Sequence, residues 1–507
     1  MFSVLLLALL PLLVLGPPPH ADVLPGQQAV REERIVELAG RAKEAMSSGR
    51  FEEAAKLYEE ILVAHPDEAG LHMNLGMARA MAGQPRAALP ALERAAQLDP
   101  SLLPAQLFLG TVYLDLGEPE RAVAPLEKVV AEQHDNTQAA QALGEALLQI
   151  ERFDEAAERF ERLTEVAPQS PSGWAGLGRS YEGGARRSFG ELQEIAPGSP
   201  YVSLIVAEVM VATRKLPQAF ALYREAQKAL PELPGVHEAI ADIYAASGQA
   251  DWAASERANA RKMAPDCGRK RAACAFLKGE LTQAVRLTNG ERTAEASYWR
   301  TRALNQLATQ AFARLERLPP SVELHAVRAR IAADQNRSLD AVEELRAALV
   351  LAPDDPSLER ELAMALHLAR DHEAVLPVAE KLLAVASDDP ELIFLYGSAL
   401  LDAQQVDRAI PYLERAVDAV AAPVEAQAAL GRALMLKGEA AAAIPHLEAA
   451  LSTDEDGSLY YQLAQAYQRS KRPTDARAAL EKYRDIKERI DAQKTEAGAS
   501  PPKITPP

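Results

Sequence analysis

The sequence has few cysteines, few aromatic residues and fewer basic than acidic side chains. Its 507 residues include 2 cysteines and 5 % aromatic residues, and 55 Lys and Arg stand against 72 Asp and Glu, which gives a net charge of -17. Proteins that bind a phosphate backbone present basic surfaces, so we expect no nucleic-acid ligand. Hydrophobic residues still make up 48 % of the chain. With so few aromatics, most of them are Ala and Leu, which favours closely packed helices.

The two cysteines, Cys267 and Cys274, are seven residues apart. They cannot form a zinc site alone, because such a site needs about four ligands. Export of the chain would favour a disulfide between them, and two buried free thiols are the alternative. A disulfide requires Cα atoms within about 7 Å. The bridge therefore also predicts that residues 266–270 are not regular helix.

Motifs for catalysis are missing as well. Gly176 and Gly178 begin like a dinucleotide-binding fingerprint, but no third glycine follows in register and no strand precedes them. No Gly-x-Ser-x-Gly nucleophile elbow occurs, and the nine histidines are scattered. We therefore expect no enzyme activity, no cofactor and no metal. An enzyme site in the segment 266–320 is a minor alternative.

The first residues predict export. The stretch 2–15 is apolar except for Ser3, and Gly16 and three prolines follow it. This stretch is too short for a membrane-spanning helix of about 20 residues, and it fits the apolar part of a signal peptide. We expect a signal peptide at residues 1–21, cleaved after Ala21, and a periplasmic or extracellular protein. The alternative is an uncleaved segment that anchors the chain, which would then be its only membrane contact.

A 34-residue self-similarity runs through most of the chain. Each unit has a Leu-Gly or Leu-Ala pair, an Ala twelve residues later, a bulky residue four further on and often a Pro eight after that. In one unit these residues are Leu75, Gly76, Ala88, Leu92 and Pro100. A unit of this length cannot bury its own apolar face and must stack on its neighbours. The chain is therefore expected to form a solenoid.

Each unit reads as two helices. Leu71, Leu75 and Ala78 have helical spacing, and a glycine such as Gly83 follows at the expected turn. The second helix ends before Pro100, since proline has no backbone donor. The repeated alanines would face the partner helix, where only a small side chain permits close approach.

These features closely resemble the tetratricopeptide repeat family over roughly residues 35–490. The resemblance implies an all-α superhelical solenoid of antiparallel helix pairs. The unit starts fall near Ile35, Ala69, Leu103, Thr137, Pro171, Pro200, Pro234, Val322, Pro356, Pro390, Val424 and Gly457. The predicted parts are a signal peptide (1–21), a linker (22–34), an N-terminal repeat array (35–265), an irregular helical segment with the cysteine pair (266–321), a C-terminal array with a capping helix (322–490) and a disordered tail (491–507).

Two stretches depart from the repeat. After Tyr181 five residues are missing, including the turn between helices, so residues 172–195 are predicted to form one long helix. Between residues 266 and 320 the frame slips, and apolar residues from Tyr298 to Leu318 again follow one helical stripe. We expect this break to change the curvature of the superhelix or to hinge two arrays.

The resemblance also implies a binding surface, because first helices of successive units line the concave face in this family. The inward positions predicted for a partner are Met73, Asn74, Met77, Phe108, Arg179, Leu204, Ile205, Arg330, Arg360, Phe394, Leu395, Arg432 and Tyr461. Family members that capture a C-terminal carboxylate use a Lys, Asn and Arg set, and Asn74 with Met73 and Phe108 does not reproduce it. The apolar residues suit an extended or helical segment with apolar anchors. For each of them, packing between repeats is the alternative.

The sequence thus predicts an exported, non-catalytic scaffold that binds a protein or peptide in its concave groove. A subunit of envelope assembly or polysaccharide export is the second hypothesis.

Overall fold

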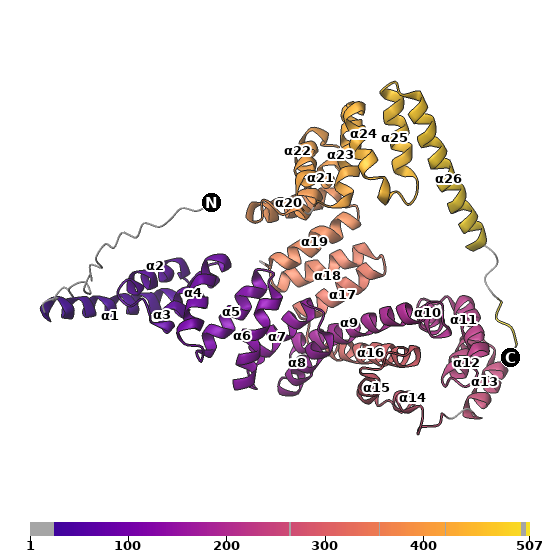
Figure 1. Cartoon of the computed structure of the whole chain (residues 1–507), viewed down its shortest axis with the longest axis horizontal. Coiled ribbons are helices and arrows are strands. Elements are labelled where there is room, and N and C mark those ends of the chain that lie inside the picture. Colours follow the sequence, from indigo (N-terminus) through magenta and orange to yellow (C-terminus); the bar gives the residue numbers. More distant parts are fainter. Residues whose placement is uncertain (1–24, 263–264, 354, 421, 498–502, 507) are drawn as a thin grey trace, which may run out of the picture. The chain divides into compact units, whose positions relative to one another are not determined.

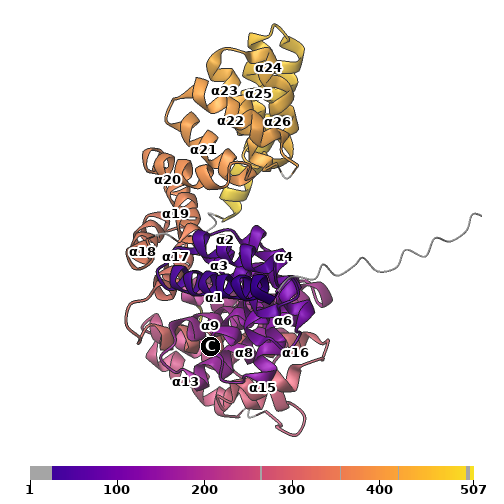
Figure 2. The same ribbon diagram turned by 90° about the vertical axis from the view of Figure 1, so that its left-hand side faces the viewer.

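The computed structural model describes residues 25–262, 265–353, 355–420, 422–497 and 503–506. The predicted signal peptide lies outside these residues. Those described form 26 α-helices, one short 3-10 helix and no strand, which confirms the all-α fold (Figures 1 and 2). The chain divides into two compact units, Met1–Ile150 and Glu151–Pro507.

The first unit is a series of helix pairs. Its helices are α1 (Pro25–Ser47), α2 (Phe51–Leu62), α3 (Ala69–Met81), α4 (Pro85–Leu98), α5 (Leu103–Asp115), α6 (Pro119–Glu132) and α7 (Thr137–Gln149). Successive first helices α3, α5 and α7 begin at residues where repeat units were expected to begin. The 34-residue period is therefore the period of the helix pairs.

The Leu-Gly pairs of the repeat have a steric cause. A Cβ on Gly76 of α3 would lie 2.4 Å from Cγ of Leu92 on α4, and Gly110 of α5 has the same relation to Leu126 on α6. Only glycine permits this approach of the two helices. Gly83 closes the α3–α4 turn with a φ of +73°, which other residues rarely adopt.

The first helix begins earlier than predicted. Residues 25–34 were expected to be linker, but α1 starts at Pro25 and runs through them. Proline is favoured in the first turn of a helix, where its missing N–H leaves no bond unmade. The Gln, Ala, Arg and Glu residues that follow are good helix formers.

The second unit contains the remaining helices. They are α8 (Phe153–Val166), α9 (Pro171–Ile195), α10 (Pro200–Ala212), α11 (Leu216–Ala229), α12 (Val236–Ala246), α13 (Ala250–Lys262), α14 (Arg271–Leu277), α15 (Leu281–Thr288), α16 (Ala294–Leu315), α17 (Val322–Asp334), α18 (Ser338–Leu351), α19 (Pro356–Leu368), α20 (His372–Val385), α21 (Pro390–Asp402), α22 (Val406–Asp418), α23 (Val424–Lys437), α24 (Ala440–Ala449), α25 (Ser458–Arg469) and α26 (Pro473–Ala497).

Two long helices, α9 and α16, pack along each other and organise this unit (Figure 1). The single helix expected at residues 172–195 is present as α9. A Cβ on Gly178 of α9 would lie 2.3 Å from the ring of Phe312 on α16, so glycine is needed for this close approach. Near the other end, Ser188 Oγ donates a hydrogen bond to the carbonyl of Ser297 (3.2 Å).

The pairs α10–α11, α12–α13 and α14–α15 lie in sequence between these two helices. After α16 the repeats continue at α17, and Leu315, Leu324 and Val327 share a small core with Ala175 of α9. Thus α9 and α16 act as the two helices of one enlarged repeat, and residues 196–293 are inserted into it.

This arrangement differs from the predicted one, in which an irregular segment (266–321) joined two arrays. That segment contains a short but ordinary helix pair, α14–α15, followed by α16. The physical reason is the missing turn after Tyr181: without it α9 continues as a helix, and its apolar stripe is covered by the stripe of α16.

Cys267 and Cys274 are joined by a disulfide, with their Cα atoms 5.6 Å apart. Cys267 lies in the turn before α14, and Cys274 lies within that helix. Residues 265–270 are not helical.

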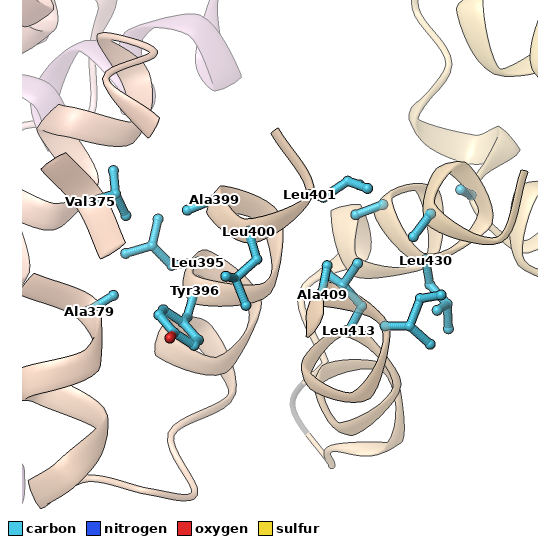
Figure 3. Packing of buried hydrophobic residues seen from close by; sticks show 14 of the residues in the cluster. Val375, Ala379, Leu395, Tyr396, Ala399, Leu400, Leu401, Ala409, Leu413 and Leu430 are labelled. Carbon is cyan, nitrogen blue, oxygen red and sulfur yellow. The ribbon is translucent and has the colours of Figure 1, made fainter. Parts of the chain in front are cut away.

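The last repeats have a continuous core of side chains from successive helices. Figure 3 shows Leu395 and Leu400 of α21 between Val375 of α20 and Leu413 of α22. Leu413 is fully buried, and a Cβ on Gly397 would lie 3.0 Å from its Cδ2. The Leu-Gly contact of the first unit thus has a counterpart here as Tyr396-Gly397.

The C-terminal end also differs from prediction. Residues 491–507 were expected to be disordered, but α26 continues to Ala497. The stretch 491–497 is rich in Ala, Gln, Lys and Glu, which favour helix. Residues 503–506 pack against the second unit, where Ile504 is half-buried.

We predict that Ala122→Leu destabilises the first unit, whereas Ala124→Leu does not. Both alanines lie on α6, but Ala122 is fully buried and Ala124 is exposed. Overpacking at such a contact costs about 1–3 kcal/mol. Thermal unfolding by circular dichroism compares the variants, and equal melting temperatures would contradict the assigned helix contact.

A second matched pair tests the α9–α16 contact. We expect Gly178→Leu to lower the melting temperature, because its Cβ would overlap the Phe312 ring. Gly190→Leu on the same helix has open space around its Cβ and should be neutral or stabilising, because glycine is a poor helix former by about 1 kcal/mol. A Gly178→Leu protein as stable as the Gly190→Leu protein would exclude close packing of α9 on α16.

Candidate partner-binding groove

First helices of four successive pairs, α19, α21, α23 and α25, line a hollow of about 760 Å³ in the second unit. We call this hollow the C-terminal groove. Its lining from these helices and the neighbouring turns is Met364, His367, Leu368, Arg370, His372, Glu391, Phe394, Leu395, Ser398, Asp402, Pro423, Glu425, Ala428, Ala429, Arg432, Ser458, Leu459 and Gln462.

The repeat places equivalent residues side by side in this groove. Met364, Ser398 and Arg432 are 34 residues apart and take the same position on successive first helices. Phe394, Ala428 and Gln462 do the same one turn earlier, at positions matching Arg360 in the repeat before. The lining therefore consists of rows, one residue per repeat, that an extended ligand could follow.

The apolar part of the groove is partly open to solvent. Leu368 is 62 % exposed and Met364 is 45 % exposed, although both are large apolar side chains. Phe394 is half-buried and packs on the core, and Leu395 is almost wholly buried beneath it. An apolar surface backed by a rigid core can bind an apolar side chain of a partner.

A polar cluster lies at one part of the groove around Asp402, the last residue of α21. Its Oδ2 atom is 3.5 Å from Nδ1 of His372, and its Oδ1 atom is 3.8 Å from a guanidinium nitrogen of Arg432. Burial lowers the pKa of nearby His367 from its ordinary value, and Asp402 opposes this shift. The cluster holds donors and an acceptor suited to the main chain or polar side chains of a peptide.

The described residues contain no group of three or more His, Cys, Asp or Glu side chains that could hold a metal ion. Nor is any described helix both long and apolar enough to cross a bilayer.

The predicted C-terminal residues divide into two groups. Phe394, Leu395 and Arg432 line the groove. Arg360 instead pairs with Asp389 and with Glu391, and so connects two repeats.

Tyr461 lies on α25 but does not line the groove. Its ring stacks against Tyr483 of α26 with centroids 5.4 Å apart, and it is 46 % exposed.

A second hollow, of about 650 Å³, lies among α9, α10, α16 and α17. Two predicted residues, Ile205 and Arg330, line it, and Arg330 forms an ion pair with Glu182 (2.7 Å). Leu204 is only 1 % exposed and belongs to the core, so its predicted place in the groove is wrong. Its neighbour Ile205 takes that place, because adjacent residues on a helix point in different directions. Arg179 is half-buried on α9.

The predicted residues of the first unit lie on two first helices. Met73, Asn74 and Met77 are half-buried on α3, and Phe108 is half-buried on α5.

Sequence reasoning missed several residues of the C-terminal groove, namely Met364, His367, Leu368, His372 and Asp402. The signal for two of them was the repeat itself. Met364 lies 34 residues before Ser398, and Leu368 lies 34 residues before Asp402. His372 had no such signal, because it begins a second helix and reaches the groove only through the course of the preceding turn.

Comparisons with known proteins agree with the repeat. Tetratricopeptide repeat models match residues 40–102 and 394–459, residues 79–144 and 117–179, and residues 457–488. A human protein described as FK506-binding protein-like is 32 % identical over 132 residues, which are 24 % of this chain and 36 % of that protein. The chain therefore spans about a third of that relative's length.

Solved structures similar to the chain include two repeat proteins. The crystal structure of MamA protein is 23 % identical, covers 30 % of this chain and 83 % of its own, and has a TM-score of 0.29. A tetratricopeptide repeat protein from Parabacteroides merdae is 14 % identical, covers 66 % of this chain and 99 % of its own, and has a TM-score of 0.33.

We predict that His367 makes the second unit less stable in acid. Its folded-state pKa lies below the ordinary value of 6.5, so the unfolded chain binds more protons as the pH falls through that value. The stability is full above this range and declines below it. In His367→Gln the loss of melting temperature between pH 7.5 and pH 5.5 should be smaller than in the wild type. His65→Gln, at an exposed position, is the control, and an unchanged loss in His367→Gln would contradict the prediction.

Proposed function

Because the chain is a tetratricopeptide-repeat protein, we propose that it is a non-catalytic scaffold that binds a segment of a partner protein in the C-terminal groove. The single observation that carries this proposal is the row of first-helix residues, with exposed Leu368 and Met364 beside half-buried Phe394. Repeat solenoids use such extended concave surfaces for binding.

The contacts suggest how the segment is held. Apolar side chains of the partner would cover Leu368 and Phe394, and the flexible Met364 can adapt to their shape. The polar cluster of Asp402, His372 and Arg432 would pair with the partner's main chain or polar side chains. Since the groove spans four repeats, many modest contacts add up, and a few buried apolar anchors supply most of the affinity.

We further propose that this partner is met outside the cytoplasm, because the apolar stretch 2–15 fits a signal peptide. A subunit of envelope assembly or polysaccharide export is the second candidate function. Co-purification of a membrane or export component with the chain, after crosslinking in envelope fractions, favours this second function.

The groove is tested by two exposed leucines of the second unit. Leu368 lies in the groove and is 62 % exposed, whereas Leu339 begins α18 outside its lining and is 68 % exposed. A photo-crosslinking amino acid is placed at each position in turn, and the captured proteins are identified by mass spectrometry. We expect a specific partner at position 368 and none at position 339.

The same pair gives the matched variants. Leu368→Glu should weaken binding of the captured partner about tenfold or more, as for a central interface anchor, and Leu339→Glu should leave it unchanged. Both side chains are exposed, so neither change should alter the melting temperature. Equal capture at both positions, or equal binding by both variants, would refute the groove as the binding surface.

A further inference from the structure

The C-terminal residues of the chain lie on α12, in the inserted part of the second unit (Figure 1). The hydroxyl of Tyr244 donates a hydrogen bond to the main-chain carbonyl of Thr505 (2.6 Å) across a separation of 261 residues. The adjacent Ile504 is half-buried against the core shared by α9 to α16. Lys503 and Pro506 are exposed. A segment predicted to be disordered is thus held by one aliphatic side chain and one main-chain hydrogen bond.

The hydrogen bond of Tyr244 is an exception to a pattern within the chain. Three tyrosines at the same position of other repeats donate instead to a glutamate on the preceding second helix: Tyr113 to Glu93, Tyr181 to Glu161 and Tyr467 to Glu448. In these repeats the hydroxyl connects one helix pair to the one before it.

The residue 20 positions before Tyr244 is Arg224 on α11, where Glu93 and Glu161 stand in the other repeats. A guanidinium group has no acceptor to offer a hydroxyl donor. Arg224 is itself engaged with Gln227 (2.9 Å) and with the buried carboxylate of Glu256 (3.3 Å). The exchange of Glu for Arg therefore leaves the hydroxyl of Tyr244 without its usual acceptor, and the C-terminal segment supplies one.

The surroundings of Tyr244 hold its ring in place. The ring lies 5.4 Å from Phe220 on α11 and 5.5 Å from Trp252 on α13, centroid to centroid. Tyr244 has no exposed surface when the C-terminal segment is present. A buried tyrosine hydroxyl needs a hydrogen-bond partner, so its orientation toward Thr505 is fixed before a ligand arrives.

We propose that the face of α12 around Tyr244 is a peptide-docking site and that the chain's own C-terminal segment occupies it as a tethered ligand. The site takes an extended, proline-flanked segment with one β-branched aliphatic anchor and a main-chain carbonyl after it. The exposed side chains at positions 503, 505 and 506 leave the rest of the sequence free. Flanking prolines stiffen the segment and reduce the entropy lost on binding. A partner segment of the same chemistry must displace the tail.

The tether decides which ligand occupies the site. A segment joined to its own site by a short flexible linker has an effective concentration of about millimolar. A free peptide of similar intrinsic affinity therefore competes poorly until the tail is removed. The residues of this site do not overlap with those of the C-terminal groove, so the two proposals stand or fall separately.

The test uses the chain ended after residue 502 and a fluorescein-labelled synthetic peptide of residues 498–507, followed by fluorescence anisotropy. We expect the peptide to bind the shortened chain and to bind the full chain at least tenfold more weakly, because the tethered tail competes. Equal binding to both chains, or binding to neither, would overturn the proposal. So would a full chain that is dimeric where the shortened chain is monomeric, since the tail would then dock on a second copy.

Changes in the peptide test the contacts without any effect on folding. Ile504→Ser in the peptide should weaken binding about tenfold or more through loss of the buried aliphatic group. Thr505→Ala should leave binding unchanged, because only the main-chain carbonyl of residue 505 is used. A peptide in which both changes have the same effect would exclude this binding mode.

Changes in the protein test the acceptor. Tyr244→Phe in the shortened chain should weaken peptide binding roughly 3- to 10-fold, as expected for one hydrogen bond. Tyr181→Phe removes the corresponding hydroxyl from a repeat in which Glu161 is the acceptor, and it should leave peptide binding unchanged. An equal loss in both variants would show that the tyrosines act only through stability.

Discussion

The packing of α9 on α16 is the contact on which the second unit depends. In an ordinary solenoid each repeat touches only its neighbours. Here one repeat is split, and its two helices come from residues 171–195 and 294–315. Closing so long a loop costs little more entropy than closing a short one, because the cost grows only with the logarithm of length. Two apolar stripes of more than five turns each can offset it. The glycine at position 178 lets the helices approach closely enough for those stripes to meet.

Charged side chains of α16 connect it to the elements on both sides. Arg300 pairs with Asp154 of α8 (2.7 Å), and Arg302 pairs with Glu208 of α10 (2.6 Å). The guanidinium of Arg302 also lies 4.5 Å from the ring centroid of Phe276 on α14, where an arginine gains from the aromatic face. Burial raises the pKa of Glu208, and Arg302 opposes that shift, so the carboxylate owes its charge to this partner. Helix α16 therefore holds the inserted pairs as well as completing the repeat.

The 34-residue period was enough to place most first helices, since α3, α5, α7, α9, α10, α17, α19, α21 and α23 begin at the predicted residues. The same period located part of the groove, because it assigns Phe394 and Arg432 to equivalent faces of neighbouring helices. It could not pair α9 with α16: an apolar stripe shows that a helix needs a partner, but not which one. Ile504 was missed for a similar reason, because four residues among prolines carry no periodic signal. Its binding site depends on the exchange of a glutamate for Arg224, far away in sequence.

A single position of the repeat can thus serve two purposes. With glutamate on the preceding second helix, the tyrosine hydroxyl is satisfied within the solenoid and contributes to the stacking of repeats, as at Tyr113 and Tyr181. With arginine there, the same hydroxyl has to find its acceptor elsewhere. The tyrosine ring keeps its packing in both cases, so the exchange leaves the fold intact and changes only what the hydroxyl can bind. In a repeat protein a binding site can therefore arise from one substitution at a stacking contact, without a new cavity or a change of backbone.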